Sequence, residues 1–70
     1  MKIKINGEFY NFDKELTILG LLKELNLIGK PVVVEHNGDI VIKENYDKIK
    51  VLDGDSFELV TFVGGGWWAL

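Results

Sequence analysis

Two Asn-Gly dipeptides do most to limit the folds that this 70-residue chain can adopt. Both residues of such a pair tolerate positive φ, so Asn-Gly between extended segments is a strong signal for a tight β-hairpin. The flanking segments are rich in apolar and β-branched residues, as strands are. Two hairpins are therefore predicted: residues 2–5 with 8–12 across Asn6-Gly7, and residues 32–34 with 40–42 across Asn37-Gly38.

A single amphipathic helix is predicted between the two hairpins. Apolar side chains recur at helical spacing from Ile18 to Leu25, and Thr17 stands at the position of an N-cap. The residues from Asn26 to Pro31 are expected to end the helix. Residues 43–50, after the second hairpin, are mostly polar and are expected to form a loop or a short helical turn.

The last predicted strand covers residues 57–63, and three glycines follow it directly. Successive glycines lose much conformational entropy when they are ordered, which disfavours extending the strand through them. We therefore expect a folded domain over residues 1–63 and a flexible glycine-rich tail over residues 64–70.

The order of these elements is strand, strand, helix, strand, short strand, strand. The last strand can pair in parallel beside the first, because everything between them supplies the crossover that parallel strands need. This order predicts an α+β chain with the ubiquitin-like β-grasp fold, in which a mixed sheet of four to five strands packs on one helix.

Composition disfavours several classes of partner and site. The formal charge of −3 argues against nucleic acid, whose binding draws on clustered Lys and Arg. No apolar run approaches the roughly 20 residues that span a bilayer, and the first residues alternate instead of forming a signal core, so we expect no membrane partner and a cytoplasmic location. The chain has no Cys and one His, and a domain of this size leaves little room for a deep catalytic cleft.

The side chains with catalytic potential form no constellation in the sequence. Ser56 is expected in a turn and His36 at the end of a strand, and nothing pairs them as nucleophile and base. A lone His is expected to be structural, and Asp53 and Asp55 lack the further oxygen ligands of a calcium loop. The glycines are followed by neither a helix nor the Lys-Ser/Thr of a P-loop. The chain is predicted not to be an enzyme and to bind no metal or cofactor itself.

The glycine run offers a function of its own, because glycine can thread a channel that excludes every other side chain. A carboxylate on Gly66 is a poor electrophile, so a partner would first convert it to an acyl-adenylate with ATP, which a sulfur nucleophile could then attack. The product, a thiocarboxylate, is a transferable sulfur. This chain would dock on the partner and extend its glycine tail into the active site, and the partner would supply catalysis. The alternative is an ordinary flexible chain end.

Four short segments stand out in the sequence: Asn6-Gly7-Glu8, Val-Glu-His-Asn-Gly at residues 34–38, Asp53-Gly54-Asp55, and Phe62-Val63-Gly64-Gly65-Gly66. Together they resemble the ThiS family, the sulfur carriers of thiamin thiazole synthesis. The resemblance runs from Met1 to Gly66, and the Phe-Val-Gly-Gly-Gly segment is its most specific part. The related MoaD carriers of molybdopterin synthesis share the fold and the Gly-Gly end, but they usually have other residues just before the glycines than the Phe62-Val63 of this chain.

The resemblance implies a β-grasp fold and adenylation of Gly66 by a ubiquitin-activating-like enzyme of the ThiF or MoeB type. It also implies conversion of that glycine to a thiocarboxylate, with Gly64 and Gly65 as the rest of the tail. The implied partners are the adenylating enzyme, which uses ATP and a sulfur donor, and a synthase that accepts the sulfur. The acceptor is left open among the thiazole, molybdopterin, a tRNA base and an amino-acid precursor.

One departure from the family pattern follows Gly66, where this chain continues with Trp-Trp-Ala-Leu at residues 67–70. Family members typically stop at the glycine pair, and in the sequence as it stands Gly66 has no free carboxylate. We favour removal of residues 67–70 by a tail-processing protease. Three alternatives stay open: a non-covalent ubiquitin-like interaction module that is never cut, a MoaD-like molybdopterin carrier, and a protein modifier that joins Gly66 to lysines of its targets.

A docking surface is predicted on the last strand, along which side chains alternate between two faces. Glu58 marks one face as the outer one, because its charge disfavours burial. Val60 and Phe62 share that face and would be exposed apolar residues beside the tail, as in many protein interfaces, so we predict that both contact a partner. The alternative is that they rest under residues 43–50 or under the two tryptophans.

Overall fold

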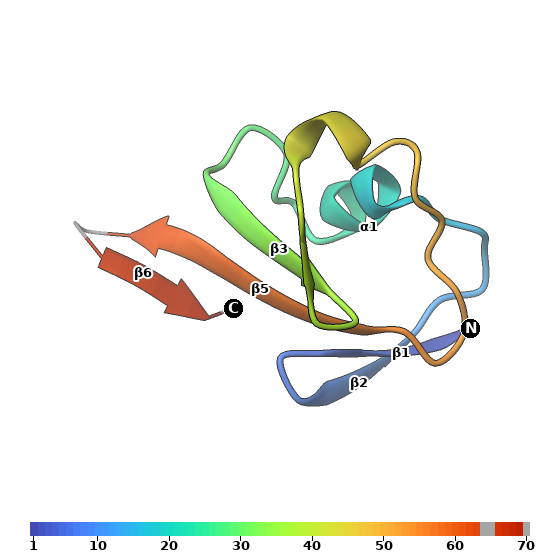
Figure 1. The fold of residues 1–70 in the computed structure, drawn as a ribbon. Coiled ribbons are helices and arrows are strands. Elements are labelled where there is room, and N and C mark those ends of the chain that lie inside the picture. The colour runs from blue at the N-terminus through green and yellow to red at the C-terminus, as the bar shows by residue number, and fades with distance from the viewer. Residues whose placement is uncertain (64–65, 70) are drawn as a thin grey trace.

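The computed structural model describes residues 1–63 and 66–69 and shows one mixed sheet curved around one helix (Figure 1). Each predicted strand and the predicted helix is present, so the expected β-grasp fold is confirmed. The elements in chain order are β1 (Lys2–Ile5), β2 (Glu8–Asn11), α1 (Ile18–Glu24), β3 (Val32–His36), β4 (Asp39–Val41), the 3₁₀ turn η1 (Lys43–Asn45), β5 (Ser56–Val63) and β6 (Gly66–Ala69).

The strands lie in the order β2-β1-β5-β3-β4, and β6 pairs with β5 as well. β1 and β5 run parallel, with Lys4 opposite Ser56 and Ile5 opposite Phe57, which confirms the pairing predicted for the first strand. The other neighbours are antiparallel. The central strand β5 is therefore held by one parallel and one antiparallel neighbour along its first half.

The core lies between the sheet and α1. A large apolar side chain that is fully buried there contributes about 1.5–3 kcal/mol to stability, relative to the same side chain exposed to water. This layer therefore supplies much of the stability of a chain that has no disulfides. The helix contributes the apolar stripe that the helical spacing of its apolar residues predicts. The largest fully buried side chains are Ile3, Ile18, Leu21, Leu22, Val34, Phe57 and Leu59.

Both ends of α1 follow from local sequence. The Thr17 hydroxyl accepts a hydrogen bond from the Gly20 amide at 3.1 Å, as predicted for an N-cap. Asn26 adopts a φ of 59°, and this left-handed conformation ends the helix after the cap at Leu25. Within the described residues, no helix is both long and apolar enough to cross a membrane.

The two Asn-Gly turns have the backbone that their composition predicts. Asn6 and Gly7 adopt φ values of 51° and 84°, and Asn37 and Gly38 adopt 50° and 91°. The positive φ at both central residues is the requirement of the turn whose twist matches paired strands. The predicted hairpins are thus confirmed, and their registers place Ile5 opposite Glu8 and His36 opposite Asp39.

The side chain of Asn6 extends the sheet beyond the end of β1. Its Oδ1 accepts from the Leu59 amide at 2.8 Å, and its Nδ2 donates to the Leu59 carbonyl at 3.1 Å. A single side-chain amide therefore satisfies both backbone groups of one β5 residue, as a paired strand residue would. This contact ties the first hairpin to the middle of β5.

The segment after the glycines differs from the prediction. Residues 66–69 form β6, which runs antiparallel to β5, with Gly66 opposite Val63 and Ala69 opposite Val60 (Figure 1). A flexible tail was expected there because glycine disfavours strands. The pairing partner, which local propensity does not include, accounts for the difference. Residues 64, 65 and 70 lie outside the described residues.

Substitutions at Asn6 should separate its two contributions to stability. We expect Asn6→Gly to lower the free energy of unfolding by about 1–2 kcal/mol, because it keeps the positive φ but loses both bonds to Leu59. Asn6→Ala should cost roughly 1 kcal/mol more, because alanine is strained at that φ. Urea denaturation measures both. Wild-type stability in the glycine variant would mean that the Leu59 contacts contribute nothing net.

Candidate functional site

The second half of β5 presents the predicted docking residues on the face of the sheet opposite the helix. Phe57, Leu59 and Thr61 point into the core and are buried, whereas Val60 is half-buried and Phe62 is 44% exposed. The predicted division of the strand into an inner and an outer face is therefore confirmed for the described side chains. A partner contact at Val60 and Phe62 stays a prediction.

Val33 on β3 joins these two residues in a small apolar surface, here called the outer patch (Val33, Val60, Phe62). Val33 lies opposite Val60 in the antiparallel ladder, and opposed residues share a face. Residues 43–50 do not cover this patch, because they pack on the helix, where the Leu19 amide donates to the Tyr46 carbonyl at 2.8 Å. The two tryptophan side chains lie outside what the structure describes.

Gly66 is held beside the outer patch by its pairing with Val63. It is half-buried, its φ is not positive, and a Cβ added there meets no atom of the described residues within 4 Å. The fold of the described residues therefore does not require a glycine at this position. Gly64 and Gly65, the other predicted tail residues, lie outside the described part of the chain.

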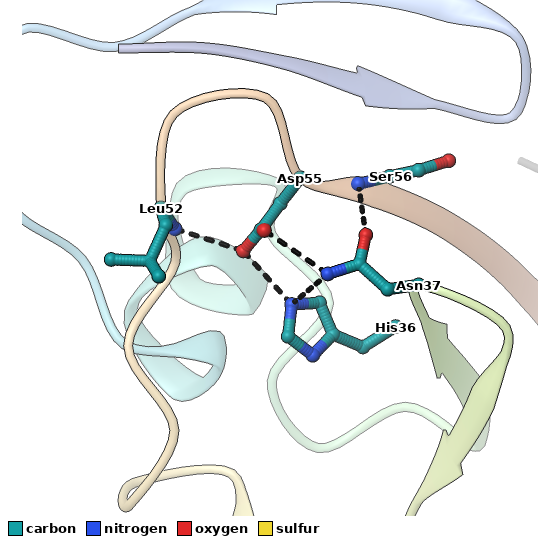
Figure 2. Close-up of polar contacts among 5 residues, drawn as sticks. All are labelled: His36, Asn37, Leu52, Asp55 and Ser56. Atoms are coloured by element: carbon teal, nitrogen blue, oxygen red, sulfur yellow. Dashed lines mark hydrogen bonds and ion pairs between the residues drawn. The ribbon is translucent and has the colours of Figure 1, made fainter.

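A polar cluster holds the opposite end of β5, where the strand begins (Figure 2). The Asp55 carboxylate accepts from His36 Nε2 at 2.8 Å, from the Leu52 amide at 2.8 Å and from Asn37 Nδ2 at 3.1 Å. Asn37 Oδ1 in turn accepts from the Ser56 amide at 2.8 Å. The cluster thus joins the β3–β4 turn to the loop that leads into β5.

Hydrogen bonds favour the charged form of the Asp55 carboxyl. An ionised carboxylate can only accept, so His36 Nε2 carries a proton toward Asp55. Partial burial alone raises the pKa of the Asp55 carboxyl, but the bonds from Leu52, His36 and Asn37 outweigh burial and lower the pKa below its usual value. The imidazole also stacks on the Phe57 ring, with centroids 4.8 Å apart.

This cluster is structural in its contacts, and it lies far from Gly66. Ser56 joins it through the backbone amide, so the contact supplies no nucleophile. β5 rises by about 3.3 Å per residue, which separates Ser56 from Val63 by roughly 23 Å. Within the described residues, no group of three His, Asp or Glu side chains is arranged to hold a metal.

Sequence reasoning treated His36 and Asp55 separately and missed their contact. The signal that could have found it is the register of two predicted strands: His36 lies opposite Phe57, which follows Asp55 by two residues. Reasoning from the sequence also missed β6, for which the apolar Trp-Trp-Ala run was the available signal.

The fold and the site define a ubiquitin-like β-grasp protein in which a glycine run directly follows the central strand. The family model described as ThiS family matches residues 3–66. The match covers nearly the whole chain and ends at Gly66. This chain belongs to the ThiS family.

Individual relatives agree with that assignment. The sulfur carrier protein ThiS of Bacillus subtilis is 40% identical over 65 residues, which cover 91% of this chain and 98% of that protein. The crystal structure of a thiamine biosynthesis protein (ThiS) from Geobacter metallireducens superposes with a TM-score of 0.80 at 35% identity, covering 94% of this chain and all of that one.

A second kind of relative is much longer. A thiazole synthase of Paramagnetospirillum magneticum is 47% identical over 66 residues, and a thiazole synthase of Magnetococcus marinus is 38% identical over the same length. The matched segment covers 94% of this chain but only 20% of each synthase. The chain therefore spans about a fifth of the length of these relatives.

The Asp55 cluster should make the free energy of unfolding depend on pH in the acid range. Because the folded pKa lies below the ordinary 3.8, the carboxylate stabilises the fold above that value, and this contribution is lost as the pH falls through the folded pKa. Asp55→Asn should lower the free energy of unfolding by about 1–3 kcal/mol near neutral pH and make its loss on acidification shallower. Denaturant titrations over the acid range test this.

The exposed strand residue Asp39 supplies the matched control. Asp39→Asn should stay within about 0.5 kcal/mol of the wild type near neutral pH, as substitutions of exposed residues usually do. If Asp55→Asn and the wild type lose equal stability on acidification, the cluster does not stabilise the fold through its charge.

Proposed function

We propose that this chain is a sulfur carrier of thiamine biosynthesis and that Gly66 carries the sulfur as a thiocarboxylate. One observation carries the proposal: the family match ends at Gly66, a glycine that the fold of the described residues does not need. Because the fold does not explain a glycine at position 66, we look for the explanation in a partner, such as a narrow channel that admits only glycine. The name of the Bacillus subtilis relative supports the same role.

The chemistry would proceed in two balanced steps on the carboxylate of Gly66. A carboxylate oxygen attacks the α-phosphorus of ATP and displaces pyrophosphate, which gives the acyl-adenylate. A sulfur nucleophile at the oxidation level of sulfide then attacks the carbonyl carbon and displaces AMP, which leaves the thiocarboxylate. The ATP site and the sulfur donor belong to an adenylating enzyme of the ubiquitin-activating type, and this chain is not itself a catalyst.

Docking to that enzyme would use the outer patch. Val33, Val60 and Phe62 are exposed or half-buried apolar residues on the face free of the helix. They lie beside β6, so a partner that covers the patch also lies next to Gly66. The rigid attachment of β5 in the sheet would set the distance between the docked face and the glycine that must reach the active site.

We propose a thiazole synthase as the protein that accepts the sulfur. The support is that two relatives named thiazole synthase contain a segment matching 94% of this chain. A matched segment within a synthase keeps carrier and acceptor at high effective concentration. A separate carrier would need its own contact surface for the synthase, and we assign that contact to the outer patch because it lies beside Gly66.

The residues that follow Gly66 must be removed before any of this chemistry can start. Gly66 is joined to Trp67 by a peptide bond, so it has no carboxylate until that bond is hydrolysed. We therefore include a processing protease among the partners. The paired strand β6 favours one competing function, a non-covalent interaction module that uses residues 66–69 uncut.

Adenylation can be tested by ATP–pyrophosphate exchange with the adenylating enzyme of the same host. We expect a chain ending at Gly66 to support exchange and the 70-residue chain to give none above background, because only the first has a free carboxylate. The matched control is a chain ending at Gly65, which should lose most of the activity. Equal exchange by the 70-residue chain and the one ending at Gly66 would contradict the proposed role of Gly66.

The outer patch can be tested in the same assay with two substitutions of one kind. Phe62→Asp in the chain ending at Gly66 should raise the apparent KM for the carrier by at least about tenfold, which is ~1.4 kcal/mol of lost docking energy. Phe9, which is 62% exposed on the first hairpin, supplies the control, and Phe9→Asp should leave KM within about twofold. Unchanged KM for Phe62→Asp, with folding retained, would exclude the patch.

A further inference from the structure

The strand β6 occupies an edge of β5 that β1 leaves free. β1 pairs only with the start of β5, at Ser56 and Phe57. β3 covers the opposite edge, and β6 continues on the edge of β1, where it pairs with residues 60–63 (Figure 1). Without β6, this part of the central strand would be an open sheet edge, which is a ready template for another strand.

Two hydrogen bonds establish which backbone groups of β5 face β6. The Leu59 amide donates to Asn6 Oδ1 on the β1 side, whereas the Phe62 amide donates at 3.4 Å to the carbonyl just ahead of β3. Backbone groups of alternate residues point to opposite edges of a strand. Thr61 and Val63 therefore direct their N–H and C=O groups toward β6, as Leu59 does toward Asn6.

The register has a direct consequence for Gly66. Thr61 lies opposite Trp68 and Val63 lies opposite Gly66, so these are the pairs whose backbone groups face each other across the ladder. The carbonyl of Gly66, at which the bond to Trp67 must be cut, is thereby directed at the Val63 amide. The reacting group of the proposed carrier is held within the sheet.

We propose that residues 66–69 are a latch that pairs with the Thr61–Val63 edge of β5 and keeps Gly66 folded back in the uncut chain. This inference rests on the proposed role of Gly66. Proteolytic cutting is favoured at exposed backbone and disfavoured where the backbone is hydrogen-bonded, so the latch must peel off before the protease can act. Once the bond after Gly66 is cut, Gly66 is the one residue of β6 that is left, which is too little to keep the strand paired.

The latch is weak enough to open. Two facing pairs hold it at the end of a sheet, and elements with so few hydrogen bonds open at the low end of the range of local unfolding free energies. β6 runs antiparallel to β5 and pairs with no other described strand. The protease would therefore act when β6 alone separates from β5, while the first half of β5 stays paired with β1 and β3.

Amide hydrogen exchange, read residue by residue by NMR, tests the latch without any partner. We expect the Thr61 amide to exchange at least about tenfold more slowly in the 70-residue chain than in a chain ending at Gly66. The Val60 and Phe62 amides face β3 and serve as internal controls whose rates should agree between the two chains. Equal Thr61 rates in the two chains would overturn the proposal.

Two proline substitutions give a matched pair within β6 itself. Trp68 directs its amide toward Thr61, so Trp68→Pro removes a donor of the ladder and should abolish the slow exchange of Thr61. Trp67 lies opposite Phe62 and directs its amide away from β5, so Trp67→Pro should leave at least half of the protection. Loss of protection in both variants, or in neither, would contradict the inferred register.

The exchange experiment tests the latch and the adenylation assay tests the carrier, so either proposal can be rejected without the other. Slow Thr61 exchange in a chain that never supports adenylation would retain the latch and reject the carrier. Adenylation by the chain ending at Gly66, with equal Thr61 exchange in both chains, would retain the carrier and reject the latch.

Discussion

Strand β5 pairs with β1 on one side and β3 on the other, and these pairings fix the position of everything that the strand carries. Its first half is bound by β1, by β3 and by the side chain of Asn6, and the polar cluster around Asp55 holds the loop that leads into it. A strand fixed in this way carries Val60 and Phe62 of the outer patch on one face, beside Val33 of β3. It also pairs through Val63 with Gly66, which fixes where Gly66 lies.

The fold could be predicted from the sequence because its signals are local. The turns at Asn6 and Asn37 need only residues that tolerate positive φ, and the helix needs only an apolar stripe after Thr17. The placement of Val60 and Phe62 on the outer face followed from strand alternation alone. Each of these features is decided within a few residues of chain.

The features that sequence reasoning missed depend on residues far apart in the chain. β6 forms because β1 ends early and leaves an edge of β5 free, a fact of the sheet that outweighs the poor strand propensity of glycine. The contact of His36 with Asp55 needs the β3–β5 register and the Leu52 amide together. No pattern within either segment contains that information.

The intact mass of the protein isolated from its native host shows whether Gly66 carries sulfur. We expect a species that ends at Gly66, part of which has one terminal oxygen replaced by sulfur under conditions that demand thiamine synthesis. If a chain that continues unmodified past Gly66 is the sole form under those conditions, Gly66 does not carry sulfur.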